Sequence, residues 1–417
     1  MADSTRAAQR IPIGVQPVPL PGHAVGEEGL RVEFHATRFA RKLGPEPLEA
    51  GLAERWDEKR KANPRLFNGS KFRWAGWDEP GAPGEKLAMR LGLSSYRMFQ
   101  GTNAAPCALE LVNYGIGSHS DPGACMGNAL GIGMAVLCTD GRLLFIRRSQ
   151  HVGEARGLVD LIGGHSEPSA AGLAPAMLLD DDEVPVGWAP SPRLRPLHAP
   201  AAAEACPPAS ANAAARRELF ASALDEVVEE MNLRRDALGP PLLLGTSCNF
   251  TTGGRVALAF VVPFAGSADD AVRRYREVPA EAFESTAMLH LPAQEVLDAV
   301  QRAGGREADD TAGWATTADG AGRASEVAEA IVGAAEPGTW RPVFELALHG
   351  AVETPSACPA GDSGEVADAA PAPGPKSLQP SQIAPACMAA LVLFALAAEA
   401  HGGVDGLQAA IRATSSA

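Results

Sequence analysis

Three glutamates near the middle of the chain, Glu226, Glu229 and Glu230, have a spacing that could serve metal chemistry. Residues 213–231 contain no proline or glycine, and their apolar residues recur at helical spacing, so a helix is predicted there. Positions i, i+3 and i+4 place the three carboxylates on one helix face, where their like charges repel. A divalent cation would remove this repulsion, and oxygen ligands favour Mg²⁺ or Mn²⁺ over zinc. The competing interpretation is a solvated acidic helix face.

A glycine turn, Gly163-Gly164-His165-Ser166-Glu167-Pro168, precedes this helix. A glycine turn followed by a helix with several glutamates on one face can hold a divalent metal against a phosphate chain. The turn therefore favours the metal site, and it predicts hydrolysis of a nucleoside diphosphate derivative. Asn232 is expected to end the helix, because asparagine tolerates the left-handed conformation that closes helices.

The elements that position these groups are predicted from periodicity and turn residues. Two strands are expected within 130–146, joined by a turn at 139–141, and a third at 157–162 runs into the glycine turn. Further strands are expected at 242–246 and 255–263, and helices at 47–63, from 95–99 onward, at 292–303 and at 383–401. This alternation predicts an α/β fold, with a mixed β-sheet sandwiched between helices.

The chain is predicted to divide into a core and several additions, because its composition changes along its length. The predicted parts are a loosely ordered N-terminus at 1–30, a globular N-terminal extension at 31–120, a core at 121–303 with a low-complexity insertion at 168–212, a second low-complexity insertion at 304–380, and a C-terminal helix of the core with a tail at 381–417.

The composition of the chain argues against some classes of protein. The 417 residues carry a formal net charge of -14, which argues against a general nucleic-acid-binding protein. The 7 cysteines form no CxxC pair, so reduced thiols in an intracellular protein are expected. The longest apolar run, 386–398, falls short of the ~20 residues that span a bilayer. We therefore expect a cytoplasmic protein with no membrane partner, and a nuclear or organellar location is left open.

Taken together, these features resemble the Nudix hydrolases, whose signature has an opening glycine and ends in R-E-U-x-E-E-x-G-U, where U is aliphatic. Six positions match this signature: Gly164, Glu226, Val227, Glu229, Glu230 and Leu233. Asp225 stands where the signature has arginine, Asn232 replaces its second glycine, and Ala170 replaces an earlier glutamate. A long insertion also interrupts the spacer.

Several segments between about 60 and 290 look more narrowly like the animal UDP-glucose/UDP-galactose diphosphatase branch of that superfamily. They occur in the same order and with similar gaps, and they include Asn63–Phe67, Lys71–Arg73, Leu91–Arg97, Gly101–Asn103, Phe145–Ser149, Gly157–Asp160, Leu242–Gly245 and Glu284–Thr286.

The resemblance implies a Nudix-type α/β/α sandwich with an N-terminal extension that contributes to the substrate site. It implies Mg²⁺-dependent cleavage of UDP-glucose or UDP-galactose to UMP and the sugar 1-phosphate. The metal ligands of that branch fall on Glu226 and Glu230, and Glu229 is counted with them as catalytic. The substrate contacts fall on Phe67, Tyr96, Arg148, Gly153, Asp160, His165 and Glu167.

The chemistry of these side chains suits a nucleotide sugar. The guanidinium of Arg148 can fork onto phosphate oxygens, and Phe67 and Tyr96 offer flat faces on which uracil could stack. The other polar members could bond ribose or hexose hydroxyls.

Several alternatives stay open from sequence. Glu218, Glu229 or Glu284 could each act as the general base. The chain could instead be a catalytically inactive binding module for a nucleotide sugar, or a hydrolase of ADP-ribose, NADH or a coenzyme A derivative. The oligomeric state is unknown.

Overall fold

The computed structural model places most of the chain. It describes residues 10–18, 21–64, 66–78, 86–150, 152, 155–174, 208–277, 284–304, 321–335, 341–344, 346–355 and 376–415.

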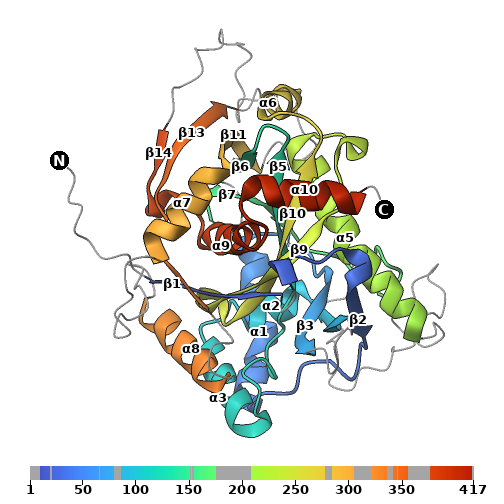
Figure 1. The fold of residues 1–417 in the computed structure, drawn as a ribbon. Helices are drawn as coiled ribbons and strands as arrows, with labels where there is room; N and C mark the ends of the chain where they lie inside the picture. The colour runs from blue at the N-terminus through green and yellow to red at the C-terminus, as the bar shows by residue number, and fades with distance from the viewer. Residues whose placement is uncertain are drawn as a thin grey trace.

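An eleven-stranded mixed sheet forms the centre of the molecule (Figure 1). Its main path runs in the order β12 (Arg341–Phe344), β1 (Arg10–Pro17), β9 (Leu242–Asn249), β10 (Arg255–Phe264), β5 (Gly131–Cys138), β6 (Arg142–Arg148), β11 (Ser285–Pro292), β13 (Leu348–Pro355) and β14 (Lys376–Leu378). Within it, β10 and β5 pair in parallel, and every other neighbouring pair is antiparallel.

The two faces of this sheet bury two separate apolar clusters, because successive side chains of a strand point to opposite faces. In β10, for example, Leu258 and Phe260 belong to one cluster, and Ala259 and Val261 belong to the other. Helix α5 (Pro208–Met231) covers the first face, and α7 (Ala293–Gly304) and α9 (Pro385–Ala400) cover the second. In Figure 1, α7 and α9 lie to the left of β9 and β10, and α5 lies to the right.

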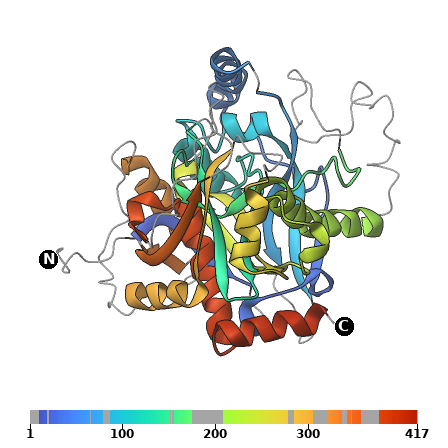
Figure 2. The ribbon, with the colours of Figure 1, turned by 90° about the horizontal axis from the view of Figure 1, so that it is seen from above.

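An N-terminal unit packs on the α5 side. Its three-stranded sheet has the order β2 (Leu30–Phe34), β4 (Leu87–Ser95) and β3 (Ser70–Asp78), and β2 contacts α5. The unit also carries α1 (Glu46–Ala62), α2 (Tyr96–Gly101) and α3 (Ala108–His119). Figure 2 shows α1 at the top of the molecule, far from α10 (Val404–Ser415) at the bottom.

A split in the central sheet positions the glycine turn. The hairpin of β5 and β6 is paired only near its tip, at Val136–Leu144 and Leu137–Leu143. Beyond that point the strands diverge, and two short strands occupy the gap: β7 (Val159–Asp160) pairs with β6, and β8 (Ile162–Gly164) pairs with β5. The glycine turn therefore emerges from the middle of the sheet, directly under α5.

The structure confirms the main predicted elements. The helix predicted at 213–231 spans Pro208–Met231, and Asn232 adopts a φ of 56 at its end, as expected. The helices predicted at 47–63, 292–303 and 383–401 occur as α1, α7 and α9, with ends shifted by one or two residues.

Two of the parts that the sequence predicts as additions to the core contribute strands to the central sheet. Residues 10–17 are not loosely ordered but form β1, which pairs with β9 and β12 inside the sheet. The second insertion contains α8 (Ala321–Ala334) and three further strands of the central sheet. Of the first insertion, residues 175–207 lie outside the described part of the chain.

No single described helix is long and apolar enough to cross a membrane. The pair α9 and α10 passes that test together by length and composition only, and the two helices are bent by 82° to each other.

Candidate active site

Three carboxylates of α5 are held by alternate residues of the glycine turn. Glu218 Oε1 accepts a hydrogen bond from the Glu167 backbone amide at 3.4 Å, and Glu226 Oε1 accepts one from the His165 amide at 3.3 Å. The backbone of Gly163 hydrogen-bonds the carboxylate of Glu230. Glutamates four and eight residues apart share a helix face, and alternate residues of an extended segment share one side, so the two periodicities match.

The glycine at 164 is required by this close approach. A Cβ atom built there would lie 1.7 Å from Glu226 Oε1, much closer than any real Cβ contact. Gly164 thus allows the carboxylate to lie directly against the backbone of β8, which agrees with its match to the opening glycine of the Nudix signature.

The site concentrates negative charge in a buried place. Burial raises the pKa of Glu226 to about 7; the hydrogen bond from His165 opposes this rise, and the charges of Glu229 and Glu284 add to it. Burial also raises the pKa of Glu230 well above its usual value, with a further contribution from Glu226. Both carboxylates therefore lack the compensation that ionised buried groups need.

A divalent cation fits this donor set. Glu230 is 3% exposed, and its Oε2 atom has no hydrogen-bond partner within the described structure. Buried polar atoms are almost always paired, so an unpaired carboxylate oxygen beside a second carboxylate marks a place for a cation. Among the described residues no three His, Cys, Asp or Glu side chains are gathered as a complete ligand set. Mg²⁺ commonly takes one or two carboxylates and completes its shell with water and phosphate oxygens, which agrees with the two ligands predicted here.

The N-terminal unit reaches the site through Lys71. Its ammonium lies 2.5 Å from Glu167 Oε1, and its side chain is only 11% exposed. Lys71 also acts electrostatically on Glu226 and His165, where its charge lowers both pKa values. Because Lys71 lies on β3 and Glu167 in the glycine turn, this pair joins the N-terminal extension to the glycine turn.

A second connection runs from His165 through Arg255 to the aromatic side chains of α2. The Arg255 guanidinium lies 3.1 Å from His165 Nε2 and stacks over the Phe99 ring at 5.0 Å. Phe99 in turn packs against Tyr96, with ring centroids 6.1 Å apart. Burial, with the charges of Arg255 and Lys71, lowers the pKa of His165 well below 6.5, so the imidazole is neutral.

The predicted stacking residues Phe67 and Tyr96 lie near each other. The Tyr96 amide donates to the carbonyl of Gly69, and the Phe67 ring lies beside Gly69. Phe67 is 58% exposed, so its ring offers an accessible aromatic face beside Gly69.

Arg148 and Asp160 lie on the strands that flank the glycine turn. Arg148 is at the end of β6, and its positive charge lowers the pKa of Glu230. Asp160 is on β7, paired with β6, and its Oδ1 accepts from the Leu161 amide. Gly153, the remaining predicted contact, lies outside the described residues.

The candidates for the general base occupy different surroundings. Glu229 is exposed and acts on Glu226 through its charge alone, whereas Glu218 is held by Ser222 and by the Glu167 amide. Glu284, directly before β11, raises the pKa of both Glu226 and Glu230 through its charge, so it lies near the same carboxylates. The assignment among the three stays a prediction.

Asp225 cannot orient the glutamates as the signature arginine would. Its side chain is 56% exposed and pairs with Arg235 on the outside of the molecule. The backbone amides of the glycine turn position the carboxylates instead.

Sequence analysis assigned no role to Lys71, Phe99 or Arg255. Lys71 lies within a segment that looks like the diphosphatase branch, and Phe99 lies between two such segments. The contacts of Lys71 and Arg255, however, join residues 96 and 90 positions apart in the sequence. Such pairs carry no local periodicity, so only the fold brings them together.

Comparison with known proteins identifies the family. The chain is 36% identical over 243 residues to the uridine diphosphate glucose pyrophosphatase of Bos taurus, covering 58% of this chain and 74% of that protein. It is 34% identical over 280 residues to the Homo sapiens protein of the same name, covering 66% and 82%. This chain belongs to the Nudix hydrolase family. A plant member, Nudix hydrolase 9 of Arabidopsis thaliana, is 30% identical over 257 residues, covering 60% of this chain and 73% of that protein. No protein-family model matches the chain.

Departures from the Nudix signature explain why no protein-family model matches this Nudix hydrolase. The segment Gly164–Leu233 contains the long insertion, and Asp225 and Asn232 replace two signature residues. The structure nevertheless keeps Gly164 against Glu226, so the local geometry survives these departures.

Proposed function

We propose that this Nudix hydrolase cleaves the diphosphate of UDP-glucose or UDP-galactose, giving UMP and the sugar 1-phosphate, with Mg²⁺ as cofactor and Mn²⁺ as a possible substitute. The relatives named uridine diphosphate glucose pyrophosphatase support the substrate class. The observation that carries the proposal is the set of buried carboxylates against the glycine turn, with Glu230 Oε2 left unpaired. The fold that we assign is a Nudix-type α/β/α sandwich with an N-terminal extension.

In the reaction, the oxygen of water forms a bond to one phosphorus, and the bond from that phosphorus to the bridging oxygen breaks. The bridging oxygen leaves with the other phosphate, and the proton of water passes to a base. When bound by Glu226 and Glu230, Mg²⁺ would neutralise non-bridging oxygens of the diphosphate.

The chain's own groups have separate tasks in this proposal. Arg148 binds a phosphate oxygen, and Phe67 and Tyr96 hold the uracil ring by stacking. Neutral His165 and the carboxylates of Asp160 and Glu167 bond sugar hydroxyls. Lys71 fixes Glu167, and Arg255 fixes the imidazole of His165.

The test is turnover of both UDP-hexoses with Mg²⁺, followed by separation of UMP and hexose 1-phosphate. Replacement of Glu230 by glutamine keeps its size and removes its charge, so Glu230→Gln is expected to lower kcat at least ~100-fold. Asp225→Asn is the matched control on the same helix, because its exposed carboxylate faces away from the turn.

The same experiment separates the competing functions. Tight binding of UDP-glucose without release of UMP by the wild-type chain would instead support a nucleotide-sugar binding module. Strong activity on ADP-ribose, NADH or a coenzyme A derivative beside weak activity on both UDP-hexoses would overturn the proposed substrate.

A further inference from the structure

A cavity of about 560 Å³ lies away from the glutamate site, between the N-terminal unit and α8. Its lining includes the segment that follows β2, parts of β3 and β4, the loop that follows α3, the start of β10 and the end of α8. This volume falls in the range of sites that hold small molecules. None of the predicted catalytic or substrate residues lines it.

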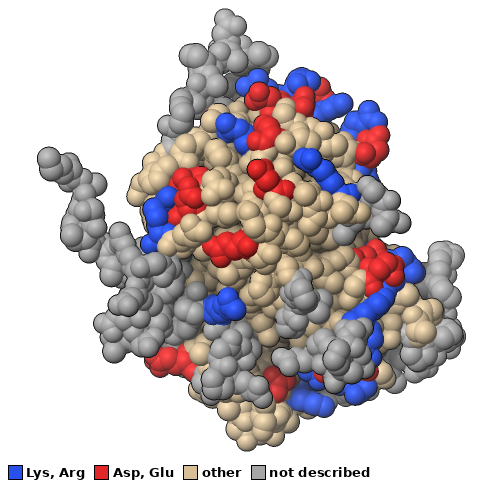
Figure 3. Space-filling model, in the orientation of Figure 1, with Lys and Arg blue, Asp and Glu red and all other residues tan. Residues whose placement is uncertain are grey.

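The described lining is rich in basic groups. Arg38, Lys42, Arg73 and Arg90 line the cavity together with His119, and Asp121 is the one acidic side chain among the lining residues. This balance is the reverse of the whole chain, whose net charge is -14. Figure 3 shows the usual pattern on one face of the molecule, where basic side chains mostly lie beside acidic ones.

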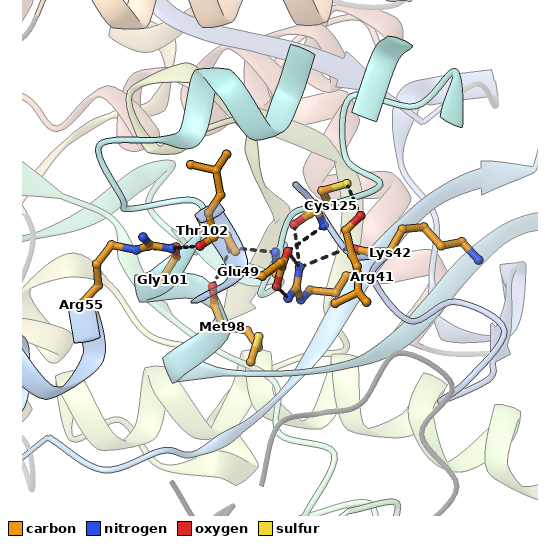
Figure 4. A network of polar contacts seen from close by, with 12 residues as sticks. Arg41, Lys42, Glu49, Arg55, Met98, Gly101, Thr102 and Cys125 are labelled. Carbon is orange, nitrogen blue, oxygen red and sulfur yellow. Dashed lines mark hydrogen bonds and ion pairs between the residues drawn. The ribbon is translucent and has the colours of Figure 1, made fainter. Parts of the chain in front are cut away.

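The cations at the mouth of the cavity are available to a ligand. Lys42 is exposed, and Figure 4 shows its side chain extending away from the neighbouring ion pair of Arg41 and Glu49. Arg38 is 63% exposed, and its partner Glu33 lies outside the lining, so an anion can compete for this guanidinium.

Arg73 forms a buried part of the cavity lining. The residue is 4% exposed, and its guanidinium donates to the carbonyls of Phe39, Gly123, Ala124 and Met126. These bonds fix the strand and the loop that carry the mouth. Ile331 of α8, which is 6% exposed, forms an apolar wall opposite.

We propose that this cavity binds a small organic phosphate. Cationic side chains at a mouth with a mixed polar and apolar interior suit an anionic head with a carbon skeleton attached. The inference that its occupancy alters the active site rests on the proposed function, whereas binding itself does not.

Two parts of the cavity lining also contact or adjoin residues that position groups of the proposed active site. Asn128 lines the cavity and exchanges hydrogen bonds with Asn103, at 2.9 and 2.8 Å, directly after α2 with its Tyr96 and Phe99. Gly254 and Val256 line the cavity on either side of Arg255, whose guanidinium faces His165 instead. A ligand that shifts these walls therefore shifts the groups that position substrate.

The binding test uses the full chain in EDTA, with glucose 6-phosphate and inorganic phosphate as probes in calorimetry. Reversal of one mouth charge in Lys42→Glu is expected to raise the dissociation constant at least tenfold. Lys61→Glu is the matched control, because Lys61 is an exposed lysine on α1 that does not line the cavity. Ala335→Trp, which places a bulky side chain in the cavity without changing charge, is also expected to weaken binding.

The kinetic test measures KM for UDP-glucose with and without saturating glucose 6-phosphate. A shift of at least threefold is expected in the wild type and in Lys61→Glu, and no shift in Lys42→Glu. Equal binding by wild type and Lys42→Glu, or no binding by the wild type, would overturn the cavity assignment. Binding without a KM shift, or a shift that persists in Lys42→Glu, would overturn the coupling.

Discussion

Without metal, Glu226 keeps its proton up to an unusually high pH for a carboxylate, because burial raises its pKa to about 7. Metal must displace that proton, so Mg²⁺ binding is expected to tighten as pH rises from 6 to 8. Each pKa unit corresponds to about 1.4 kcal/mol of differential interaction. Calorimetric titration of Mg²⁺ across this range measures the effect, and Glu226→Gln is expected to flatten the profile. An affinity independent of pH in the wild type would contradict this view of the site.

Glu226 also links stability to pH when no metal is bound. A carboxyl whose pKa is higher in the folded than in the unfolded chain holds its proton more tightly when folded. The stabilising contribution is present below the unfolded value of about 4.5 and is lost as pH rises through about 7. The midpoint temperature of thermal unfolding in EDTA should therefore decrease as the pH rises from 5.5 to 7.5. This decrease should be larger in the wild type than in Glu226→Gln.

Lys71 is expected to matter more for turnover than for folding. In its ion pair with Glu167, the Glu167 carboxylate is partly exposed to solvent. Such pairs contribute little stability, about 0–1 kcal/mol. Lys71→Met keeps much of the buried stem but releases Glu167, and kcat/KM is expected to fall roughly 10- to 100-fold, a loss of about 1.4 to 2.8 kcal/mol. Kinetics and denaturant unfolding are measured together.

Lys61→Met, on the exposed face of α1, is the control for Lys71→Met. A loss of stability as large as the loss of kcat/KM would show that Lys71 acts only in folding.

At the scale of elements, the contact between β8 and α5 depends on Gly164. Gly164→Ala places a methyl group on the position of the Glu226 carboxylate, so either the side chain or the helix must move. We expect the variant to fold, to lose the thermal stabilisation by Mg²⁺, and to lose at least ~100-fold in kcat. Circular dichroism with and without Mg²⁺ checks the first two expectations.

The control is Gly117→Ala in α3, where an added Cβ meets nothing within 4 Å. Alanine is the better helix former, so this variant should be neutral or slightly stabilised. Full Mg²⁺ stabilisation in Gly164→Ala would show that Glu226 can bind the ion from another position.

The sequence predicts elements well where one periodicity runs without interruption. The helix that carries Glu226 and Glu230 has such a run, and its last turn is closed by Asn232 as expected. Strand β1 was not predicted, because its proline- and glycine-rich surroundings are typical of loops, and its pairing partner β9 lies more than 200 residues away.

The short strands β7 and β8 show a different limit. The sequence predicts one strand at 157–162, whereas the chain changes partner at Leu161, from β6 to β5. This change depends on how far β5 and β6 diverge, which is a property of the whole sheet. The contacts of Lys71 and Arg255 depend on the same tertiary geometry.

At the scale of the whole molecule, strand β1 and helix α9, which lie far apart in the sequence, contribute to the same apolar cluster, on the face of the central sheet opposite α5. Strand β1 lies between β9 and β12, and α9 packs across β1 and β9. The close approach shows at Gly245, where an added Cβ would lie 2.4 Å from the Gln16 carbonyl oxygen and 2.9 Å from the Leu393 side chain. Strand β1 and helix α9 therefore stabilise each other through β9.

This arrangement predicts that damage to the apolar cluster covered by α7 and α9 reduces stability but not catalysis. Leu393 is 0% exposed, so Leu393→Ala should cost about 2–5 kcal/mol of unfolding free energy. The half-buried neighbour Val392 provides the control, and Val392→Ala should cost less. Because α9 covers the face of the sheet opposite α5, KM and Mg²⁺ affinity should be unchanged below the unfolding transition. Denaturant unfolding and steady-state kinetics measure both quantities, and a changed KM in folded Leu393→Ala would show that the two faces of the sheet are not independent.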